Sequence, residues 1–301
     1  MDEPGRQAAA RVVADIAREA GQLIRDRFSK PREIGVKSAA IDLVTDTDRA
    51  ADRLIAERLA AAFPEDGLVS EEGGVVPPAR FRATSAGASA ATGDPAEGAL
   101  YWIVDPLDGT TNFAHGFPQF AVSIAAVAGL DPMRPLAAPP RADAAPVIGV
   151  VYDPMRDELY SATRQGPATL NGAPIGVTTE TSLDACLIAT GFPYDRRERA
   201  DFYLAFWRAM IVRCRDVRRV GAAALDLAWV ACGRLDGFWE WNLHAWDIAA
   251  GALIVERAGG RATDFSGEPL VVDARQTLAT NGRVHDDVLS IIRPLAGAKR
   301  P

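Results

Sequence analysis

Asp105 and Asp108 stand three residues apart at the end of a short apolar run, residues 102–104, and a glycine-led turn follows them. A hydrophobic run bounded by proline and glycine predicts a buried strand that ends in a loop. Two acids at such a place repel each other and lose hydration unless a cation neutralises them. Carboxylate oxygens suit a hard divalent ion, and Mg²⁺ is the best match. We therefore predict a magnesium site on these two acids.

The turn itself, Gly109-Thr110-Thr111, offers backbone N–H groups and two hydroxyls. Donors grouped in this way suit a phosphate oxygen or a polarised water. The alternative is an acidic turn that only caps a helix, because Asp, Gly and Thr are common turn residues.

Acidic residues also gather at three other places. Glu71 and Glu72 follow a short predicted strand at residues 68–69, and a solvated turn is the simpler interpretation of that pair. Three acids crowd into residues 42–48, where Thr45 can serve as the N-cap of a helix whose dipole favours acids in its first turn. Capping explains Thr45 better than it explains the number of acids.

The third place is Asp247, which follows Trp246 at the start of a late predicted helix. The simpler interpretation is an aromatic packing residue beside an acid that favours the helix dipole. The functional alternative is that Asp247 points into the same acidic site from the far side.

The composition bounds the function of the chain. With 301 residues, a net charge of −7 and a pI near 5.1, it lacks the basic footprint of a nucleic-acid-binding protein. Its three cysteines (Cys186, Cys214 and Cys232) are too widely spaced for a zinc site or a disulfide framework and fit a reducing compartment. We expect a cytoplasmic protein, because the sequence shows neither a signal peptide nor an apolar run of membrane length.

Hydrophobic periodicity predicts the elements that position these residues. An amphipathic helix over residues 8–28 precedes a loop or hairpin at 31–40, which contains Lys37, and a second helix follows the acids at 42–48. The regions 75–98 and 131–146 have the composition of irregular surface insertions.

Strands dominate the middle of the chain, which predicts an antiparallel or mixed sheet with strands at 120–127, 147–152 and 158–163 and a hairpin turn at 170–173. The last third alternates, which favours layered α/β packing. Its predicted strands are 186–190, 217–220, 236–241, 261–263 and 277–280, and its predicted helices are 198–213, 221–232, 246–258 and 285–293.

Four short motifs together resemble a known family. In chain order they are Asp42-Leu-Val-Thr-x-x-Asp48, Ser70-Glu71-Glu72, the segment 102–112 that contains Asp105 and Asp108, and Trp246-Asp247-Ile-Ala-Ala-Gly251. Each motif is weak alone, but this order is typical of the inositol monophosphatase family of lithium-sensitive, Mg²⁺-dependent sugar phosphatases.

The resemblance implies an αβαβα five-layer sandwich, usually a homodimer. It implies a single domain over residues 1–301, with an N-terminal α+β half at about 1–185 and a C-terminal α/β half at about 186–301. The activity it implies is direct hydrolysis of a phosphate monoester, such as inositol monophosphate or a similar small polyol phosphate, by water at a two-metal site.

The resemblance also implies the metal ligands. Two Mg²⁺ ions are expected, and a weaker third ion near Glu71 is implied for some members. The first ion would be held by Glu71, Asp105 and the backbone carbonyl of Leu107, and the second by Asp105, Asp108 and Asp247.

The catalytic and substrate contacts are implied in the same way. Thr110 would orient the attacking water, with Asp48 accepting the threonine hydroxyl proton, and Glu71 would act as base through the water of the first ion. Lys37 matches a mobile basic position near the metals. The implied substrate contacts are Asp108, Gly109, Thr110 and Thr111, together with Ala223 and Glu240 at the sugar hydroxyls.

Other activities remain open within this resemblance. Histidinol phosphate and fructose 1,6-bisphosphate are substrates of enzymes with the same fold. Some bacterial relatives join transcription complexes, so a protein-binding role is the alternative from a different class. The presence of all four metal-binding acids favours an enzyme, and we expect His115, His244 and the aromatic residues at 238–241 to be structural.

Overall fold

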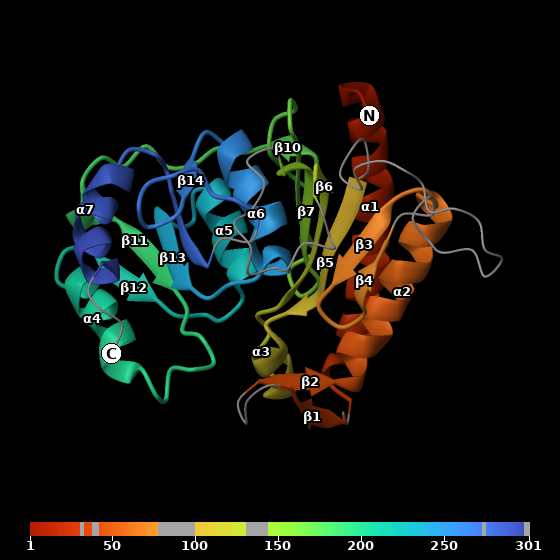
Figure 1. Ribbon diagram of the computed structural model, residues 1–301, viewed down its shortest axis with the longest axis horizontal. Coiled ribbons are helices and arrows are strands. Elements are labelled where there is room, and N and C mark those ends of the chain that lie inside the picture. The colour runs from red at the N-terminus through yellow and green to blue at the C-terminus, as the bar shows by residue number, and fades with distance from the viewer. Residues whose placement is uncertain (31–32, 38–41, 78–99, 131–143, 273–274, 298–301) are drawn as a thin grey trace, which may run out of the picture.

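The computed structural model describes residues 1–30, 33–37, 42–77, 100–130, 144–272 and 275–297. Two sheets and three layers of helices alternate in it (Figure 1). The pair α1 and α2 covers the outer face of an eight-stranded sheet, α5 and α6 fill the space between the sheets, and α4 and α7 cover the far face of a five-stranded sheet. This is the layered α/β sandwich that the resemblance implied.

The α-helices of the described chain are α1 (Glu3–Phe28), α2 (Asp46–Ala62), α3 (Thr110–Ala114), α4 (Ala200–Ile211), α5 (Ala223–Ala231), α6 (Ala245–Arg257) and α7 (His285–Ala296), and a short 3-10 helix, η2, spans Leu183–Ala185. The eight-stranded sheet has the order β10-β9-β8-β7-β6-β5-β3-β4, and the five-stranded sheet has the order β12-β11-β13-β15-β14. In chain order the strands of the larger sheet are β3 (Gly67–Ser70), β4 (Gly74–Val76), β5 (Leu100–Asp108), β6 (Ala121–Ala128), β7 (Ala145–Asp153), β8 (Glu158–Thr163), β9 (Thr169–Leu170) and β10 (Ala173–Pro174).

The smaller sheet contains β11 (Leu187–Thr190), β12 (Asp216–Arg218), β13 (Gly237–Trp241), β14 (Arg261–Thr263) and β15 (Gln276–Thr280). A separate hairpin is formed by β1 (Ile34–Val36) and β2 (Leu43–Thr45). The predicted elements of the last third are all present, and their ends lie within one helical turn of the predicted ends.

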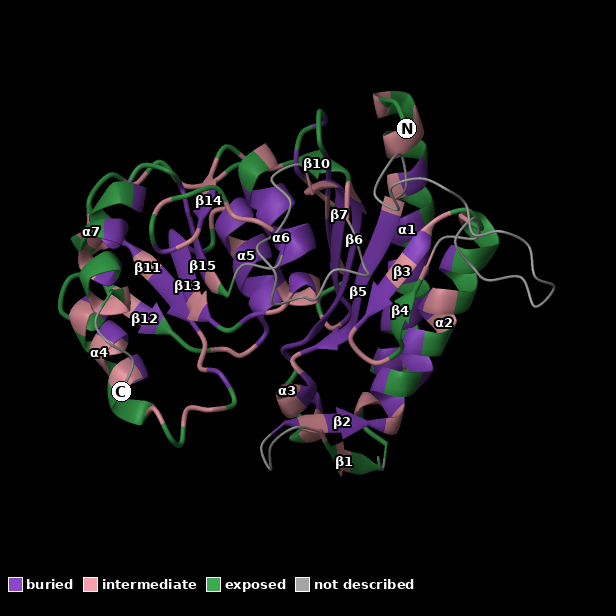
Figure 2. Ribbon diagram, viewed as in Figure 1, coloured by how far each residue is buried: buried purple, intermediate pink, exposed green. Residues whose placement is uncertain are grey.

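β5 runs through the middle of the larger sheet and is buried along its length (Figure 2). Its side chains alternate between the two faces, as a strand requires. Trp102 and Val104 pack with α1 and α2, whereas Tyr101 and Ile103 pack on the side of α5 and α6. Continued alternation places Asp105 on the α6 side.

The pairing of β5 with β6 is irregular between the two acids. Asp105 lies opposite Ser123, but Asp108 lies opposite Ala121, so three steps along β5 match two steps along β6. This extra residue is typical of a β-bulge. Within this segment, the Leu107 side chain packs in the core beneath α1 and α2. Unbroken alternation would have placed it on the opposite face, with Asp105. The bulge therefore brings Asp108 to the same face of the sheet as Asp105.

The central helix layer is closely packed, which fixes where α6 presents its first turn. A side chain in place of Gly251 would put its Cβ 2.6 Å from the Cβ of Leu227, so only glycine lets α5 and α6 approach this closely. At the other end of the contact, the Ser123 hydroxyl donates a hydrogen bond of 3.0 Å to the carbonyl of Trp246. These contacts hold the start of α6 against the strand beside β5.

Three predicted boundaries were wrong. α1 begins at Glu3 instead of residue 8, because the side chain of Asp2 caps it by accepting the N–H of Gly5 at 3.0 Å. The two predicted insertions were also too long. Residues 75–76 belong to β4, which pairs with β3, and residues 145–146 belong to β7. The remainder of both insertions (78–98 and 131–143) lies outside the described residues.

The turn at 170–173 joins β9 to β10 as predicted, with Asn171 and Gly172 in the left-handed conformation. Cys186 and Cys214 are buried and Cys232 is half-buried, all as free thiols. In the part of the chain that the structure covers, no helix has the length and hydropathy needed to cross a membrane.

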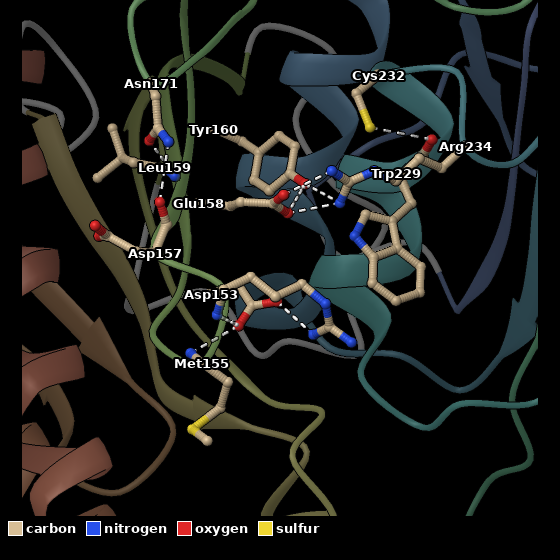
Figure 3. A network of polar contacts seen from close by, with 11 residues as sticks. Asp153, Met155, Asp157, Glu158, Leu159, Tyr160, Asn171, Trp229, Cys232 and Arg234 are labelled. Atoms are coloured by element: carbon tan, nitrogen blue, oxygen red, sulfur yellow. Dashed lines mark hydrogen bonds and ion pairs between the residues drawn. The ribbon is translucent and has the colours of Figure 1, made fainter.

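An ion pair joins the middle helix layer to the larger sheet (Figure 3). Both guanidinium nitrogens of Arg234, just beyond α5, lie 2.6 Å from the two carboxylate oxygens of Glu158 on β8. The Tyr160 hydroxyl donates to the same carboxylate at 2.7 Å. The Arg234 hydrogen bond, and then that of Tyr160, hold the pKa of Glu158 below its usual value against the effect of burial. The geometry is that of a strong bidentate pair.

We predict that Glu158→Gln lowers the free energy of unfolding by about 1–3 kcal/mol at neutral pH, because it removes a charge-assisted bidentate contact. The pKa of Glu158 is depressed in the folded state, so this stabilisation is present above the unfolded pKa and is lost as the pH falls through the folded pKa. Urea unfolding at several pH values would therefore show the difference from wild type shrinking in acid.

The matched control is Glu256→Gln, which removes a pair with Arg164 in which both side chains are about 40 % exposed. Such a surface pair contributes only about 0–1 kcal/mol. If both variants lower the free energy of unfolding by the same amount, the Glu158–Arg234 pair contributes no more than a surface ion pair, and the prediction is wrong.

Candidate active site

A polar pocket of about 740 Å³ opens where the two sheets meet. Its walls come from the carboxyl ends of β5, β11 and β13 and from the start of α6. Ligands of layered α/β proteins commonly bind at the carboxyl ends of strands. The pocket collects residues from all four motifs, including Asp42, Glu71, Asp105 and Asp247.

Three aspartates form the floor of this pocket. Carboxylate oxygens of Asp105, Asp108 and Asp247 all lie within 4.8 Å of one another. Burial, and then the charges of neighbouring acids, raise the pKa of Asp105 and of Asp247 well above the usual value. Burial raises the pKa of Asp108 to about 7, while N–H donors from α5 oppose that rise. Each of these carboxylates therefore needs a nearby cation to stay ionised near neutral pH.

Backbone N–H groups fix each of the three carboxylates. Asp105 Oδ1 accepts from the N–H of Leu107 at 2.9 Å. Asp108 Oδ2 accepts from the N–H of Ala224 at 2.7 Å, in the first turn of α5, and Asp247 Oδ2 accepts from the N–H of His244 at 2.7 Å. The first turns of helices favour negative charge. Because a carboxylate has two oxygens, each side chain keeps acceptor capacity for a cation.

Glu71 stands beside this cluster and is paired with a lysine. Its backbone N–H donates to the carbonyl of Val104 at 3.1 Å, and its Oε1 lies 2.8 Å from Lys37 Nζ. Lys37 also forms an ion pair with Glu72. Burial alone would lower the pKa of Lys37, but the two glutamates raise it, so its ammonium stays charged. The solvated turn considered for the glutamate pair is thus a lysine-bridged site at the pocket wall.

Thr110, Asp48 and Thr45 form a hydrogen-bonded chain behind the floor. Thr110 Oγ1 lies 2.8 Å from Asp48 Oδ1 and 3.0 Å from the carbonyl oxygen of Leu107. Asp48 Oδ2 accepts the N–H of Thr45 at 2.8 Å and also its hydroxyl. The predicted N-cap role of Thr45 is confirmed, and Asp48 completes its capping box. A hydroxyl has one proton, so Thr110 donates to one acceptor and keeps lone pairs for a donor in the pocket.

Glu240 projects from β13 into the opposite wall. It lies directly against Gly191, where the Cβ of any other residue would come within 2.2 Å of its carboxylate carbon. Burial raises the pKa of Glu240 to about 8, against the charges of Arg219 and Arg196. Ala223, the first residue of α5, lines the pocket as well. The structure therefore places both predicted sugar contacts in the pocket that holds the acids.

The turn residues Gly109, Thr110 and Thr111 also line the pocket, and Gly109 is the left-handed N-cap of α3. Of the three histidines, His115 is exposed and His285 is buried between two threonines. His244 lines the pocket and stacks on Trp246 with ring centroids 4.7 Å apart. The expectation that the aromatics at 238–241 pack in the core is confirmed, since Phe238, Trp239 and Trp241 are buried.

Several residues of the site were missed from the sequence. Asn112 donates from its amide to the carbonyls of Gln119 and Val220 at 2.8 Å and 2.7 Å, which ties the acidic turn to the loop before α5. Asp226 is buried beside the site with an oxygen that has no hydrogen bond among the described residues. Arg196 and Arg219 line the wall near Glu240. Asn112 ends the motif 102–112, but its contacts were not predicted. No local motif marked Asp226, Arg196 or Arg219, since only the fold brings residues 196 and 219 beside β13.

Comparisons with known proteins show the family of the chain. The sequence profile described as Inositol monophosphatase family matches residues 6–295. Nus factor SuhB of Pseudomonas aeruginosa is 38% identical over 282 residues, which cover 92% of this chain and 93% of that protein. Inositol-1-monophosphatase of a Synechocystis strain is 38% identical over 269 residues, which cover 89% of this chain and 83% of that protein.

Solved structures show the same architecture. Extragenic suppressor protein suhB of Bartonella henselae superposes with a TM-score of 0.80 at 34% identity, covering 97% of this chain and 99% of that one. An inositol monophosphatase from Anabaena superposes with a TM-score of 0.77 at 32% identity, covering 96% of both chains. The profile match, the relatives and the structures all extend over nearly the whole sequence, and the chain belongs to the inositol monophosphatase family.

Proposed function

We propose that this protein is a Mg²⁺-dependent phosphatase that hydrolyses inositol monophosphate or a similar small polyol phosphate by direct attack of water. The observation that carries the proposal is the cluster of three buried aspartates, with carboxylate oxygens within 4.8 Å of one another, on the floor of a polar pocket. Buried acids this close need compensating cations. Family membership supports phosphatase chemistry at this site.

The residues present fit magnesium. All donors are carboxylate or carbonyl oxygens, which a hard divalent ion prefers over nitrogen or sulfur. Glu71, Asp105 and the carbonyl of Leu107 would hold one ion, and Asp105, Asp108 and Asp247 a second; the proposal leaves room for a third, weaker ion near Glu71. Bound ions in such a site supply a nucleophile at neutral pH and neutralise charge on the phosphoryl oxygens.

The chain's own residues position the reactants. Thr110, whose proton is engaged by Asp48 or by the Leu107 carbonyl, accepts a hydrogen bond from the attacking water and so orients it. The N–H groups of Gly109 and Thr110 bind phosphate oxygens at the start of α3. The water oxygen forms a bond to phosphorus, the ester P–O bond breaks, and the alcohol leaves with a proton.

Ala223 and Glu240 are the proposed contacts of the alcohol part, with Thr111 beside the phosphate. Glu240 has no hydrogen-bond partner in the described chain, and its raised pKa near 8 lets it donate to or accept from a sugar hydroxyl. The homodimer, the lithium sensitivity and the cytoplasmic location remain predictions from the resemblance. Phosphatases for histidinol phosphate or fructose 1,6-bisphosphate are the alternatives of the same fold.

A second candidate is a protein-binding role. The relatives from Pseudomonas aeruginosa and from Escherichia coli, 38% and 36% identical, carry the name Nus factor SuhB. An assay of phosphate release separates the phosphatase from the protein-binding role. Its substrates are inositol 1-phosphate, histidinol phosphate and fructose 1,6-bisphosphate, each tested with Mg²⁺, with chelator and with added Li⁺. Mg²⁺-dependent turnover supports the phosphatase. No turnover together with no Mg²⁺ binding would support the second candidate.

We predict that Asp108→Asn reduces turnover at least ~10³-fold, because it removes a charge that faces the cation site. The asparagine oxygen can still accept from the N–H of Ala224, and the burial that raises the pKa of Asp108 no longer opposes a charge. Thermal unfolding in chelator should therefore be no lower than in wild type. Mg²⁺ should stabilise the variant less than it stabilises wild type.

Asp287→Asn, an exposed acid in the first turn of α7, is the matched control and should leave turnover unchanged. Near-normal turnover in Asp108→Asn would refute the proposed metal site.

We predict that Glu240→Ala lowers kcat/KM for inositol 1-phosphate about tenfold more than for an aryl phosphate, since only the former presents hydroxyls to this side chain. Steady-state kinetics on both substrates measures the ratio. Glu240→Gln should lose less, because an amide keeps both a donor and an acceptor. Equal losses on the two substrates would contradict the contact.

A further inference from the structure

Two carboxylates of α2 lie one helical turn apart on its buried face, and each reaches the end of a different strand. Asp48 Oδ1 lies 2.8 Å from Thr110 Oγ1, just beyond β5. Asp52 accepts a hydrogen bond from the hydroxyl of Ser70, the last residue of β3. Because β3 and β5 are parallel neighbours in the larger sheet, α2 is joined to both strands at their carboxyl ends.

Asp52 contacts both ends of the turn that carries Glu71. This turn, residues 71–73, follows Ser70 directly and leads into β4. One carboxylate oxygen of Asp52 accepts from Ser70 before the turn. The other oxygen lies against Gly73 at the end of the turn, where an added Cβ would lie 2.8 Å from Oδ2. The absence of a side chain at Gly73 thus lets the carboxylate close on the turn.

Two other contacts hold the same turn from different directions. The Glu71 N–H donates to the carbonyl of Val104 on β5, and Lys37 pairs with the carboxylates of Glu71 and Glu72. The lysine competes with any metal ion for the Glu71 carboxylate, so it cannot hold that side chain ready for the ion. The contacts of β5 and of Asp52 leave this carboxylate free and remain available when it binds a cation.

The simpler interpretation is that Asp52 only attaches α2 to the sheet. Asp52 is 8 % exposed, and burial raises its pKa; the charge of Glu72 adds to the rise, and the Ser70 hydroxyl opposes it. A buried carboxylate beside another acid is a costly way to attach a helix, since an apolar contact would do so without desolvating a charge. Such a cost is typical of residues that support a functional site.

Resting on the proposed phosphatase function, we propose that Asp52 is a positioning residue, which holds the turn at residues 71–73 against α2 and so keeps Glu71 in place for the first metal ion. Asp52 does not line the pocket itself and acts through Ser70 and Gly73. Residues that orient a metal ligand from behind typically change metal affinity or activity by about 10–100-fold when they are removed.

The test measures Mg²⁺ binding by calorimetry, together with the Mg²⁺ concentration that gives half-maximal hydrolysis of an aryl phosphate. We expect Asp52→Ala to raise the dissociation constant and the half-saturating concentration about tenfold each. The kcat at saturating Mg²⁺ should fall less, because the pocket keeps all of its own side chains. Wild-type Mg²⁺ affinity in Asp52→Ala would overturn the proposal.

Two further variants test the hydrogen bond itself. Asp52→Asn keeps an acceptor for the Ser70 hydroxyl and should restore Mg²⁺ affinity to within about threefold of wild type. Ser70→Ala removes the same hydrogen bond by deleting one oxygen, so it tests the contact even if Asp52→Ala does not fold. It should weaken Mg²⁺ binding, and the double variant should bind no more weakly than Asp52→Ala. Additive losses, or an Asn variant as weak as the Ala variant, would contradict the proposal.

Asp66→Ala is the matched control. Asp66 is a half-buried acid just before β3, and it accepts the indole N–H of Trp102 on β5 at 3.0 Å. Its removal loosens the same pair of strands at the end away from Glu71. It should lower the free energy of unfolding in chelator and leave Mg²⁺ affinity unchanged. Equal weakening of Mg²⁺ binding by Asp66→Ala and Asp52→Ala would show a general loss of sheet stability and would refute the positioning role.

Failure of the proposed function gives a different result, namely wild type that neither binds Mg²⁺ nor hydrolyses aryl phosphate. Hydrogen exchange in chelator then decides the inference without metal or turnover. The N–H of Glu71 should exchange at least about tenfold faster in Asp52→Ala than in wild type, and Asp66→Ala should leave its exchange unchanged. Equal exchange at Glu71 in wild type and Asp52→Ala would refute the inference.

Discussion

The mutual repulsion of buried carboxylates is the constraint on which this structure depends. Asp105, Asp108 and Asp247 are within one ion's reach of each other, and burial raises the pKa of each. Backbone N–H groups at the starts of α5 and α6 offset part of this repulsion, because they donate hydrogen bonds to Asp108 and Asp247. The two helices of the middle layer thus stabilise the acids as well as fill the space between the sheets.

The geometry of β5 follows from the same constraint. A regular strand would turn Asp105 and Asp108 to opposite faces, and the second acid would enter the apolar core beneath α1 and α2. The bulge between them corrects this at the expense of regular pairing with β6. Local irregularity at a site, supported by a well-packed sheet on either side, is a common arrangement in enzymes.

The sequence predicted the secondary-structure elements better than it predicted the full set of residues in the site. Helical and strand periodicity predicted the elements and most of their bounds, and the order of the motifs predicted that Glu71, Asp105 and Asp247 belong together. The sequence could not predict Arg196 or Arg219 as parts of the site, because their neighbours come from distant segments and no spacing rule joins them. Asn112 ends the motif 102–112, but its hydrogen bond to the distant Val220 could not be predicted. The bulge was hidden too, since Asp105-Pro-Leu-Asp108 is equally consistent with a turn.

The amide of Asn112 has a consequence for how such a pocket can be remodelled. Its hydrogen bonds to Gln119 and Val220 join the turn that follows the acids to the loop that carries Arg219. Three of the four predicted metal-binding acids (Glu71, Asp105 and Asp108) lie in the larger sheet or directly after one of its strands. Glu240 lies in the smaller sheet, and Arg196 and Arg219 lie on loops that follow strands of that sheet. A designer could therefore exchange the wall of the smaller sheet to change the shape of ligand accepted. The acid floor would keep its alignment as long as this amide and the hydrogen bond from Ala224 to Asp108 still join the two halves.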